Sequence, residues 1–326
     1  MEREIVVGTA RGEAGRWTTG RLTLGYYPDG PITSPVNILC GEQPGPVLWV
    51  QSAIHGDEPG GAIGSLRLLK RCDPKAMKGA IIMVMAANPT AFRSHARNTP
   101  FDCENMNRCF PGDPNGGHSS RTASILMETA SSVADVVMDL HSGGIEAIVP
   151  FYAIYREDGS ATSREARRLA RATGTPDIWA CQDAWLDGAM FVNFVKQGKP
   201  AVIVECGGGG LMPEAHIENF ASAVEGVARA IGIIPGEPTI QPRYRTMGQC
   251  FIVFNQRGGF FAPAVSAGDI VEKGQPLGRI LSPHGEIVEE VVSPNGPGYV
   301  AALSRPYLPV YSGAWIAETI QVLDAV

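Results

Sequence analysis

The chain has few of the features that mark specialised protein classes. Its seven cysteines are odd in number, scattered and never spaced as C-x-x-C, which argues against a disulfide framework, against a thiolate zinc site and for a reducing compartment. No apolar run approaches the roughly 20 residues of a membrane helix. Residues 1–7 lack the charged region and apolar core of a signal peptide. We therefore expect a cytoplasmic protein without a membrane partner.

The chain also lacks a large excess of charge of one sign. There are 27 Lys and Arg against 33 Asp and Glu, a formal net charge of -6, and no basic block stands above the background. Nucleic acids and anionic membranes bind basic surfaces, so we expect neither as a partner. A length of 326 residues with 44% hydrophobic residues is enough for one large domain and a smaller one.

Apolar runs alternate with helical patterns through the first two thirds of the chain. The apolar runs lie at 46–53, 80–86, 136–141, 148–155 and 200–205. Helical patterns lie at about 59–72, 119–134, 163–173, 189–197 and 213–231. The runs are mostly continuous, as in parallel strands that are covered on both faces. The alternation predicts an α/β fold with a mixed, largely parallel sheet and helices on both faces.

Two boundaries divide the chain. Residues 1–36 carry short alternating patterns and are predicted to be peripheral strands of a catalytic domain that covers 1–235. Three prolines in 235–242 indicate a linker. Beyond it, short apolar runs separated by Gly-rich turns predict a small all-β, barrel-like domain over 243–326.

Two details of the first domain can be predicted more closely. The helix at 59–72 should turn Ile63, Leu66, Leu68 and Leu69 toward the sheet. Residues 88–118 keep no periodicity, and long irregular segments inside a compact domain are often functional. The helix after them should begin at Ser119 or Ser120 as its N-cap.

Three side chains at strand ends suggest a metal site. His55 and Glu58 stand where the first apolar run breaks into glycines, and His141 ends the run 136–141. Two nitrogens and one carboxylate oxygen form a three-ligand set with an open fourth position, as in catalytic zinc sites. In open α/β sheets, ligands bind beyond the carboxyl ends of the strands.

A His-x-x-Glu motif alone is weak evidence. A His at a strand end is more often a hydrogen-bonded structural residue, and a Glu at a helix start is favoured by the helix dipole. Glu205 adds weight, because it ends another apolar run and four glycines, 207–210, follow it closely. Asp139 lies on the same strand side as His141, where it would either orient an imidazole or be an ordinary acid at the core edge.

Five motifs in this order resemble the succinylglutamate desuccinylase/aspartoacylase family, a branch of the zinc-carboxypeptidase-like fold. They are His55-Gly56-Asp57-Glu58, Asn88-Pro89, Asn107-Arg108, Asp139-Leu140-His141 and Val204-Glu205, spread over about 40–230. The resemblance implies a zinc-dependent amidohydrolase acting on an N-acyl amino acid or a related small carboxylate-bearing amide. It implies one Zn²⁺ per chain, held by His55, Glu58 and His141.

The resemblance also implies residue roles. Glu205 would be the general base and then the acid, because a partly desolvated Glu has a raised pKa. Zinc would lower the pKa of a bound water to about 7 and polarise the acyl carbonyl. Asn107 and Arg108 would bind the substrate carboxylate, which a guanidinium fork matches bidentately. Arg97 would stabilise the oxyanion, with Arg93 as a competitor for that role.

One departure from the family bears on the substrate. Members that bind a second substrate carboxylate carry another Arg shortly before the catalytic Glu, whereas this chain offers only Lys196 and Lys199 there. A small neutral acyl group such as acetyl is therefore favoured, and N-acetyl-diamino acids of ectoine breakdown are one candidate substrate. The C-terminal domain resembles a β-barrel-like module of bacterial members, which would shape the pocket or form a homo-oligomer contact. It is also reminiscent of biotinyl/lipoyl hammerheads, but its 293–296 turn holds no Lys for a swinging arm.

Two other classes stay open. A metallocarboxypeptidase acting on short peptides would share the metal centre, and a non-catalytic binding protein could retain the fold. The other histidines are expected at the surface or in structural positions: His95, His118, His216 and His284. Four aromatic residues would either line the pocket or pack in the core: Tyr152, Tyr155, Trp179 and Trp185.

Overall fold

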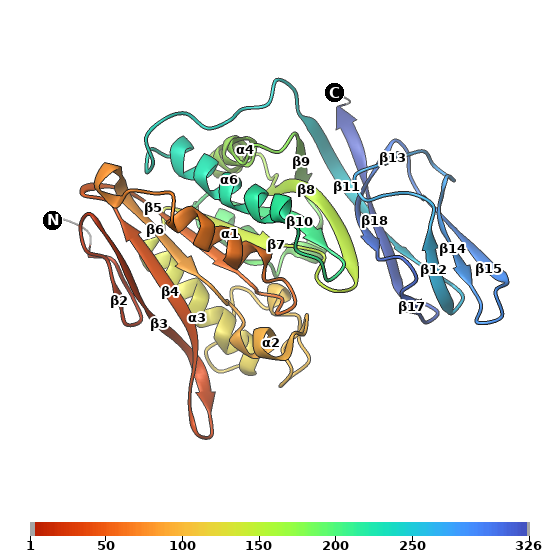
Figure 1. The fold of residues 1–326 in the computed structure, drawn as a ribbon, viewed down its shortest axis with the longest axis horizontal. Coiled ribbons are helices and arrows are strands. Elements are labelled where there is room, and N and C mark those ends of the chain that lie inside the picture. The colour runs from red at the N-terminus through yellow and green to blue at the C-terminus, as the bar shows by residue number, and fades with distance from the viewer. Residues whose placement is uncertain (1–3, 325–326) are drawn as a thin grey trace.

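A mixed sheet of twelve strands with helices on both faces forms most of the molecule (Figure 1). The computed structural model describes residues 4–324. The strands of this sheet are β3 (Arg16–Tyr27), β4 (Gly30–Cys40), β5 (Gln43–Ser52), β6 (Lys78–Val84), β7 (Val136–His141), β8 (Ala147–Arg156), β9 (Asp177–Cys181), β10 (Ala201–Gly208), β11 (Arg245–Phe254), β13 (Ile270–Val271), β16 (Gly298–Ser304) and β18 (Trp315–Asp324). The helices are α1 (Gly60–Leu69), α2 (Pro89–Ser94), α3 (His118–Val133), α4 (Ala161–Ala172), α5 (Met190–Lys196) and α6 (Glu214–Ala230), with the 3₁₀ turns η1 (Pro74–Ala76), η2 (Met106–Arg108) and η3 (Ala184–Leu186).

The sheet is parallel in its centre and antiparallel at its two outer edges, and β8, β9 and β11 form a second parallel group. Its spatial order is β13-β16-β18-β11-β9-β8-β10-β7-β5-β6-β4-β3. The pairs β10–β7, β7–β5 and β5–β6 are parallel, whereas β8 runs antiparallel to β10. Glu205 lies opposite His141, and Ser52 lies opposite Leu140. The carboxyl ends of β5, β7 and β10 therefore meet at one edge of the sheet.

Helices bury both faces of this central sheet. On one face, α1 and α6 place Leu68 and Phe220 in a core cluster with Leu48 of β5. On the other face, α3 places Leu126 in a cluster with Trp49, the next residue of the same strand. Successive side chains of a strand point to opposite faces, so burial of both faces requires the continuous apolar runs seen in the sequence.

The inward face of α1 differs from the prediction. Leu68 and Leu69 are buried as predicted, but Ile63 and Leu66 are 39% and 42% exposed, so their predicted inward direction is wrong. Gly61 and Gly64 are buried instead. A Cβ on Gly64 would lie 2.5 Å from the Cβ of Phe220, so a glycine is needed for α1 to approach α6 this closely. Close packing of the two helices, rather than apolar size, decides which face is buried.

The segment 88–118 contains more regular structure than its sequence indicated. It holds the six-residue helix α2 and the turn η2, which are too short to show a helical period. The helix after it, α3, has Gly117 at its N-cap, so the prediction of Ser119 or Ser120 as the cap is wrong. Asp102 replaces a local cap: its Oδ2 accepts a 2.8 Å hydrogen bond from the backbone N–H of Ser119.

The described residues after the proline-rich segment contain strands and no helix. β11, β13, β16 and β18 continue the large sheet, while β12 (Gly259–Pro263), β14 (Pro276–Leu281), β15 (Ile287–Val292) and β17 (Pro309–Val310) form a separate four-stranded sheet. Leu303 of β16 also pairs with Ile148 of β8. The all-β region is therefore joined to the α/β part by strand pairing, and the boundaries 1–235 and 243–326 stay predictions.

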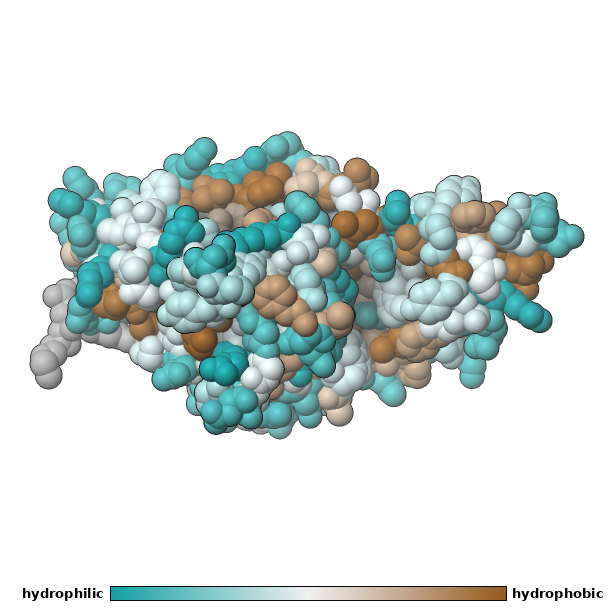
Figure 2. All heavy atoms as spheres, turned by 90° about the horizontal axis from the view of Figure 1, so that it is seen from below, coloured by the Kyte–Doolittle hydropathy of each residue, from teal (hydrophilic) through white to brown (hydrophobic). Residues whose placement is uncertain are grey.

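The surface of the C-terminal region and the N-terminal strands complete the description of the fold. In Figure 2 the C-terminal region projects at one end of the molecule, and hydrophobic residues on that face alternate with hydrophilic ones. β1 (Val6–Val7) and β2 (Ala10–Arg11) form a small hairpin beside β3. Among residues 4–324, no helix is long and apolar enough to cross a membrane, and no disulfide forms.

Candidate metal centre

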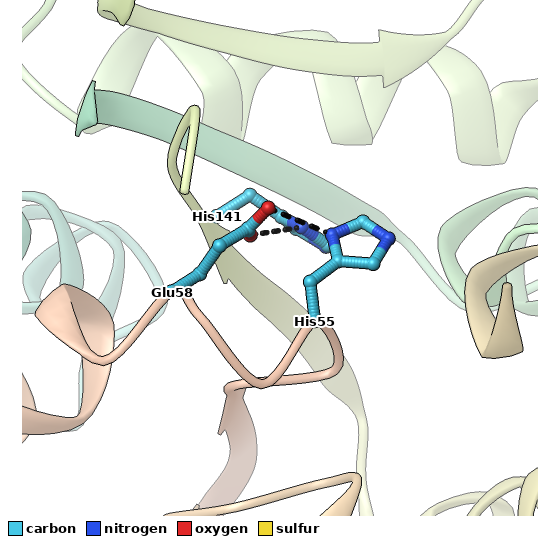
Figure 3. A group of neighbouring side chains, drawn as sticks. All are labelled: His55, Glu58 and His141. Carbon is cyan, nitrogen blue, oxygen red and sulfur yellow. Dashed lines mark hydrogen bonds and ion pairs between the residues drawn. The ribbon is translucent and has the colours of Figure 1, made fainter. Parts of the chain in front are cut away.

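Three buried side chains meet at the carboxyl edge of the sheet (Figure 3). His55 and Glu58 lie in the turn between β5 and α1, and His141 is the last residue of β7. His55 Nδ1 lies 2.9 Å from Glu58 Oε1, and His141 Nδ1 lies 3.0 Å from Glu58 Oε2. One possible ligand atom from each of the three lies within 4.8 Å of the others. The Glu58 carboxylate thus bridges the two imidazoles.

The turn that carries His55 and Glu58 is shaped by a close backbone approach. The N–H of Gly56 donates to the carbonyl of Ala96 at 2.8 Å, and the N–H of Glu58 donates to the carbonyl of His55 at 3.2 Å. A Cβ on Gly56 would lie 2.0 Å from the carbonyl carbon of Ala91. A glycine at position 56 therefore lets the segment after β6 lie against the turn and hold it.

The outer nitrogen of each imidazole faces an oxygen. His55 Nε2 lies 3.0 Å from Asn105 Oδ1, and His141 Nε2 lies 3.1 Å from Asp139 Oδ2. The Asp139 carboxylate is 1% exposed. Among the described residues His141 is its one ion-pair partner, and neither of its oxygens accepts a well-aligned hydrogen bond. Such contacts fix the tautomer and turn Nδ1 toward the cluster, as in metal-binding histidines. The geometry favours the orienting role for Asp139 over an ordinary acid at the core edge.

The charges inside the cluster compensate one another. Burial opposes the charged form of His141, but Asp139 and Glu58 outweigh burial and hold its pKa well above the usual value. Burial and the nearby Arg97 lower the pKa of His55. Burial also opposes ionisation of Glu58, yet both histidines hold its pKa well below the usual range. These shifts favour the ionised form of Glu58, the neutral form of His55 and the protonated form of His141.

This donor set fits a metal ion. Bonds of about 2.0–2.2 Å in a tetrahedral site place ligand atoms roughly 3.4 Å apart. The Nδ1–carboxylate contacts here are 2.9 and 3.0 Å, so small rotations would open the cluster to that spacing. A cation would take the place of the His141 proton, because metal ligation needs the neutral imidazole. His55, Glu58 and His141 could therefore hold a metal ion.

Glu205 lies beside the cluster. Its Cα pairs with that of His141 across β10 and β7, and its side chain lines the same cavity. Burial raises its pKa to about 8, with the charge of His141 acting in the opposite direction. A carboxyl group with such a pKa can both take up and release a proton near neutral pH.

The cluster opens into a cavity of about 640 Å³. Its walls come from the turn after β5, the segment 88–118, the strands β8 and β10, and the C-terminal strands β11, β16 and β18. Tyr152 and Trp185 line it, whereas Tyr155 and Trp179 are buried in the two core clusters. His95, expected at the surface, is exposed and lies among the lining residues.

The two candidate oxyanion arginines point in different directions. Arg97 lines the cavity, and its Nη1 donates a 3.0 Å hydrogen bond to Glu58 Oε1. Arg93 is not among the cavity-lining residues, and its guanidinium lies 5.4 Å from the ring centroid of Tyr27. The structure therefore brings Arg97, and not Arg93, to the cluster.

Asn107 and Arg108 occupy different positions. Arg108 lines the cavity, with its guanidinium 4.9 Å from the ring centroid of Trp185, and burial lowers its pKa to about 10. Asn107 is buried: its Nδ2 lies 3.4 Å from His141 Nε2, and its Oδ1 accepts from the N–H of Met190. Direct contact of Asn107 with a substrate stays a prediction.

Sequence reasoning missed three residues of this site. Asn105 contacts His55, and Trp315 and Glu318 reach the cavity from β18. A signal existed for Glu318, because it is a lone acid inside the apolar stretch 314–320. Asn105 and Trp315 carry no comparable signal, since isolated Asn and Trp residues occur in many loops and strands.

Comparison with known proteins identifies the family of this chain. Residues 44–231 match the model of the succinylglutamate desuccinylase/aspartoacylase catalytic domain. N-alpha-acetyl-L-2,4-diaminobutyric acid deacetylase of Halomonas elongata is 33% identical over 266 residues, 77% of this chain and 75% of that protein. The product-bound ectoine utilization protein of Ruegeria pomeroyi superposes with a TM-score of 0.84 at 25% identity, covering 94% of this chain and 95% of that one. An aspartoacylase family protein of Mesorhizobium loti gives a TM-score of 0.79 at 26% identity over 99% of both chains. This chain belongs to the succinylglutamate desuccinylase/aspartoacylase family.

Proposed function

We propose that the chain is a zinc-dependent deacylase that hydrolyses the amide bond of an N-acyl amino acid. One observation carries the proposal: the His55–Glu58–His141 cluster, Glu205 and two arginines share one cavity. The relative from Halomonas elongata is named as a deacetylase of an N-acetyl amino acid, which supports the same reaction class here.

The cluster would hold one zinc ion per chain. His55 and His141 would bind through Nδ1 and Glu58 through its carboxylate, a three-ligand set of the kind found in catalytic zinc sites. When bound, zinc would acidify a water molecule and polarise the acyl carbonyl. Asn105 and Asp139 would hold the two imidazoles in the ligating tautomer.

Glu205 would move the proton. It borders the cluster on the cavity side, and burial raises its pKa to about 8. It would take a proton from the attacking water and deliver it to the leaving amine. The raised pKa suits both steps, since neither the uptake nor the release of the proton is then far uphill near neutral pH.

The two arginines would orient the substrate. Arg97 already reaches the Glu58 carboxylate, and its guanidinium would stabilise the negative charge that develops on the acyl oxygen. Arg108 is held by Trp185 and by the carbonyl of Asn107, to which its Nη1 donates at 2.8 Å. Its remaining donors would bind the substrate carboxylate. We propose that Asn107 supports this site from behind the cavity wall.

The decisive experiment combines metal analysis with an amine-release screen over N-acetyl, N-succinyl and N-formyl amino acids and short peptides. We expect about one zinc per chain and the fastest release from an N-acetyl amino acid. His141→Ala should lose stoichiometric metal. Glu205→Gln should retain the metal and lose hydrolysis by about two to four orders of magnitude.

Three results would contradict the proposal. Faster cleavage of short peptides would identify a carboxypeptidase, and absent metal without hydrolysis would favour a binding protein. Full activity of Glu205→Gln would show that Glu205 does not transfer the proton.

A further inference from the structure

Glu318 places an acidic side chain from the C-terminal region in the wall of the cavity. It lies in β18, where it pairs with Ile252 of β11 and Ala302 of β16. Both of these neighbours also line the cavity. The strands β11, β18 and β16 therefore form one wall that faces the metal cluster, and Glu318 is the acid in the middle of it.

The surroundings of Glu318 are mostly apolar or aromatic. Besides Ile252 and Ala302, the indole of Trp315 lies close enough to hydrogen-bond its carboxylate. Burial raises the pKa of Glu318, and the positive charges of Arg97 and Arg108 act against that rise. Among residues 4–324, however, no ion pair includes Glu318. Arg97 pairs with Glu58, and Nη1 of Arg108 donates to the carbonyl of Asn107. A partly buried carboxylate without an ion-pair partner would gain from a cation.

The other acidic residues that line this cavity contact groups of the protein itself, lie beside the cluster or are exposed. Glu58 bridges the two histidines, and Glu205 lies beside them at the end of β10. Asp57 accepts a 3.0 Å hydrogen bond through Oδ2 from the backbone N–H of Ile145. Glu146 is exposed. Glu318 is thus the partly buried acid that neither faces the cluster histidines nor holds a backbone group.

We propose that Glu318 binds a positively charged group of the substrate, so that the substrate class is N-acyl amino acids with an ammonium-bearing side chain. This inference rests on the proposed function. Acylation removes the charge of the α-amine, so a positive charge has to come from the side chain. If the acyl carbonyl lies at the cluster and the carboxylate lies at Arg108, the side chain is the part left to face β18.

The chemistry of this wall suits an ammonium group. A charge-assisted hydrogen bond from ammonium to carboxylate is strong where water is partly excluded. Trp315 also lines the cavity, and an indole ring is a cation–π partner for an ammonium group. A carboxylate-bearing side chain would instead meet a like charge at Glu318.

The test compares substrates that differ in side-chain charge at nearly constant size. The probes are N-α-acetyl-L-2,4-diaminobutyrate (ammonium), N-acetyl-L-norvaline (its neutral isostere) and N-acetyl-L-glutamate (carboxylate). Zinc-loaded wild type should show the highest kcat/KM for the ammonium probe. Glu318→Gln should lower that kcat/KM about 10–100-fold, chiefly through KM, because a hydrogen bond between charged groups is lost. The value for the norvaline probe should change less than about twofold.

Two further variants separate specificity from structure. Glu318→Asp should restore part of the preference for ammonium. Glu146→Gln removes an exposed acid that lines the same cavity, and it should leave the preference unchanged. An equal loss on all three probes in Glu318→Gln would make Glu318 a structural residue and overturn the proposal. A lost preference in Glu146→Gln would equally overturn it.

Failure of the proposed function would be recognised separately. If wild type hydrolyses none of the probes, calorimetry still measures binding of free L-2,4-diaminobutyrate and L-norvaline to the zinc-loaded protein. Preferential binding of the diamine that disappears in Glu318→Gln would support the inference without hydrolysis. Equal binding of the two amino acids, or binding of neither, would overturn it.

Discussion

Replacement of Asp139 by Asn tests whether His141 binds the metal through Nδ1. Asp139 Oδ2 lies 3.1 Å from His141 Nε2, while Nδ1 faces Glu58 at 3.0 Å. The carboxylate keeps a proton on Nε2 and leaves the Nδ1 lone pair for a metal. Asn keeps the shape but removes the negative charge, and its amide can present either an acceptor or a donor to Nε2. The tautomer is then no longer fixed.

The size of this effect follows from the position of Asp139. Loss of such a supporting contact typically costs 10–100-fold in metal affinity, which is about 1.4–2.7 kcal/mol at 1.36 kcal/mol per factor of ten. Asp139 is 1% exposed, so water has little access to replace the lost carboxylate. We therefore expect a loss of zinc affinity in the upper half of this 10–100-fold range. The pKa of His141, which the charge of Asp139 helps to hold high, should fall as well.

Competition against a chromophoric zinc chelator at pH 7 measures the affinity, and calorimetry in two buffers measures proton release. Zinc binding to wild type should release the proton of His141, and Asp139→Asn should release less. Asp135→Asn is the matched control, because Asp135 lies beyond the other end of β7, where its Oδ2 accepts from the N–H of Val47. Unchanged affinity and proton release in Asp139→Asn would refute Nδ1 ligation supported by this carboxylate.

Three further outcomes follow from the structure. Arg108→Lys should raise KM for N-acetyl amino acids roughly tenfold, because Lys lacks the bidentate fork; an equal rise for substrate amides without a carboxylate would contradict the assigned role. In metal-free protein, the pKa of His141 is higher in the folded state than its value of 6.5 in the unfolded state. The stabilisation from this difference is complete below pH 6.5 and is lost as the pH rises through the folded-state pKa. The raised pKa of Glu205, about 8 against 4.5 unfolded, likewise lowers stability as pH rises through that interval. Urea midpoints of chelator-treated protein should therefore fall above about pH 6.5, and a rising midpoint would refute both assignments. Gly64→Ala should destabilise the fold by about 1–3 kcal/mol in urea unfolding, because its Cβ would lie 2.5 Å from that of Phe220; a variant as stable as wild type would show that α1 can shift freely.

The features that the sequence predicted well are local ones. Continuous apolar runs marked β5, β6, β7 and β10, and the residue at the end of a run marked a strand terminus. Parallel strands share the direction of their carboxyl ends, so His55, His141 and Glu205 could be assigned to one edge without coordinates. β9 was missed because its five residues give too short a pattern.

Helix faces and caps were less predictable. Apolar size suggested that Ile63 and Leu66 point inward with Leu68 and Leu69, but the close contact of Gly64 with Phe220 leaves Ile63 and Leu66 partly exposed. The N-terminus of α3 is capped by Asp102, a residue 17 positions away from Ser119. Neither contact can be recognised from neighbouring residues in the sequence, because each depends on how separate elements pack.

By itself the sequence determined the family motifs, the α/β alternation and the residues at the strand ends, because these depend on period and order along the chain. Only the tertiary structure decided that Arg97 rather than Arg93 reaches Glu58. Only it placed Asn105 against His55 and Glu318 in the cavity. The physical reason is that these side chains arrive from a long loop and from a strand near the end of the chain. Their positions are set by packing across the sheet and by strand pairing, which no local pattern records.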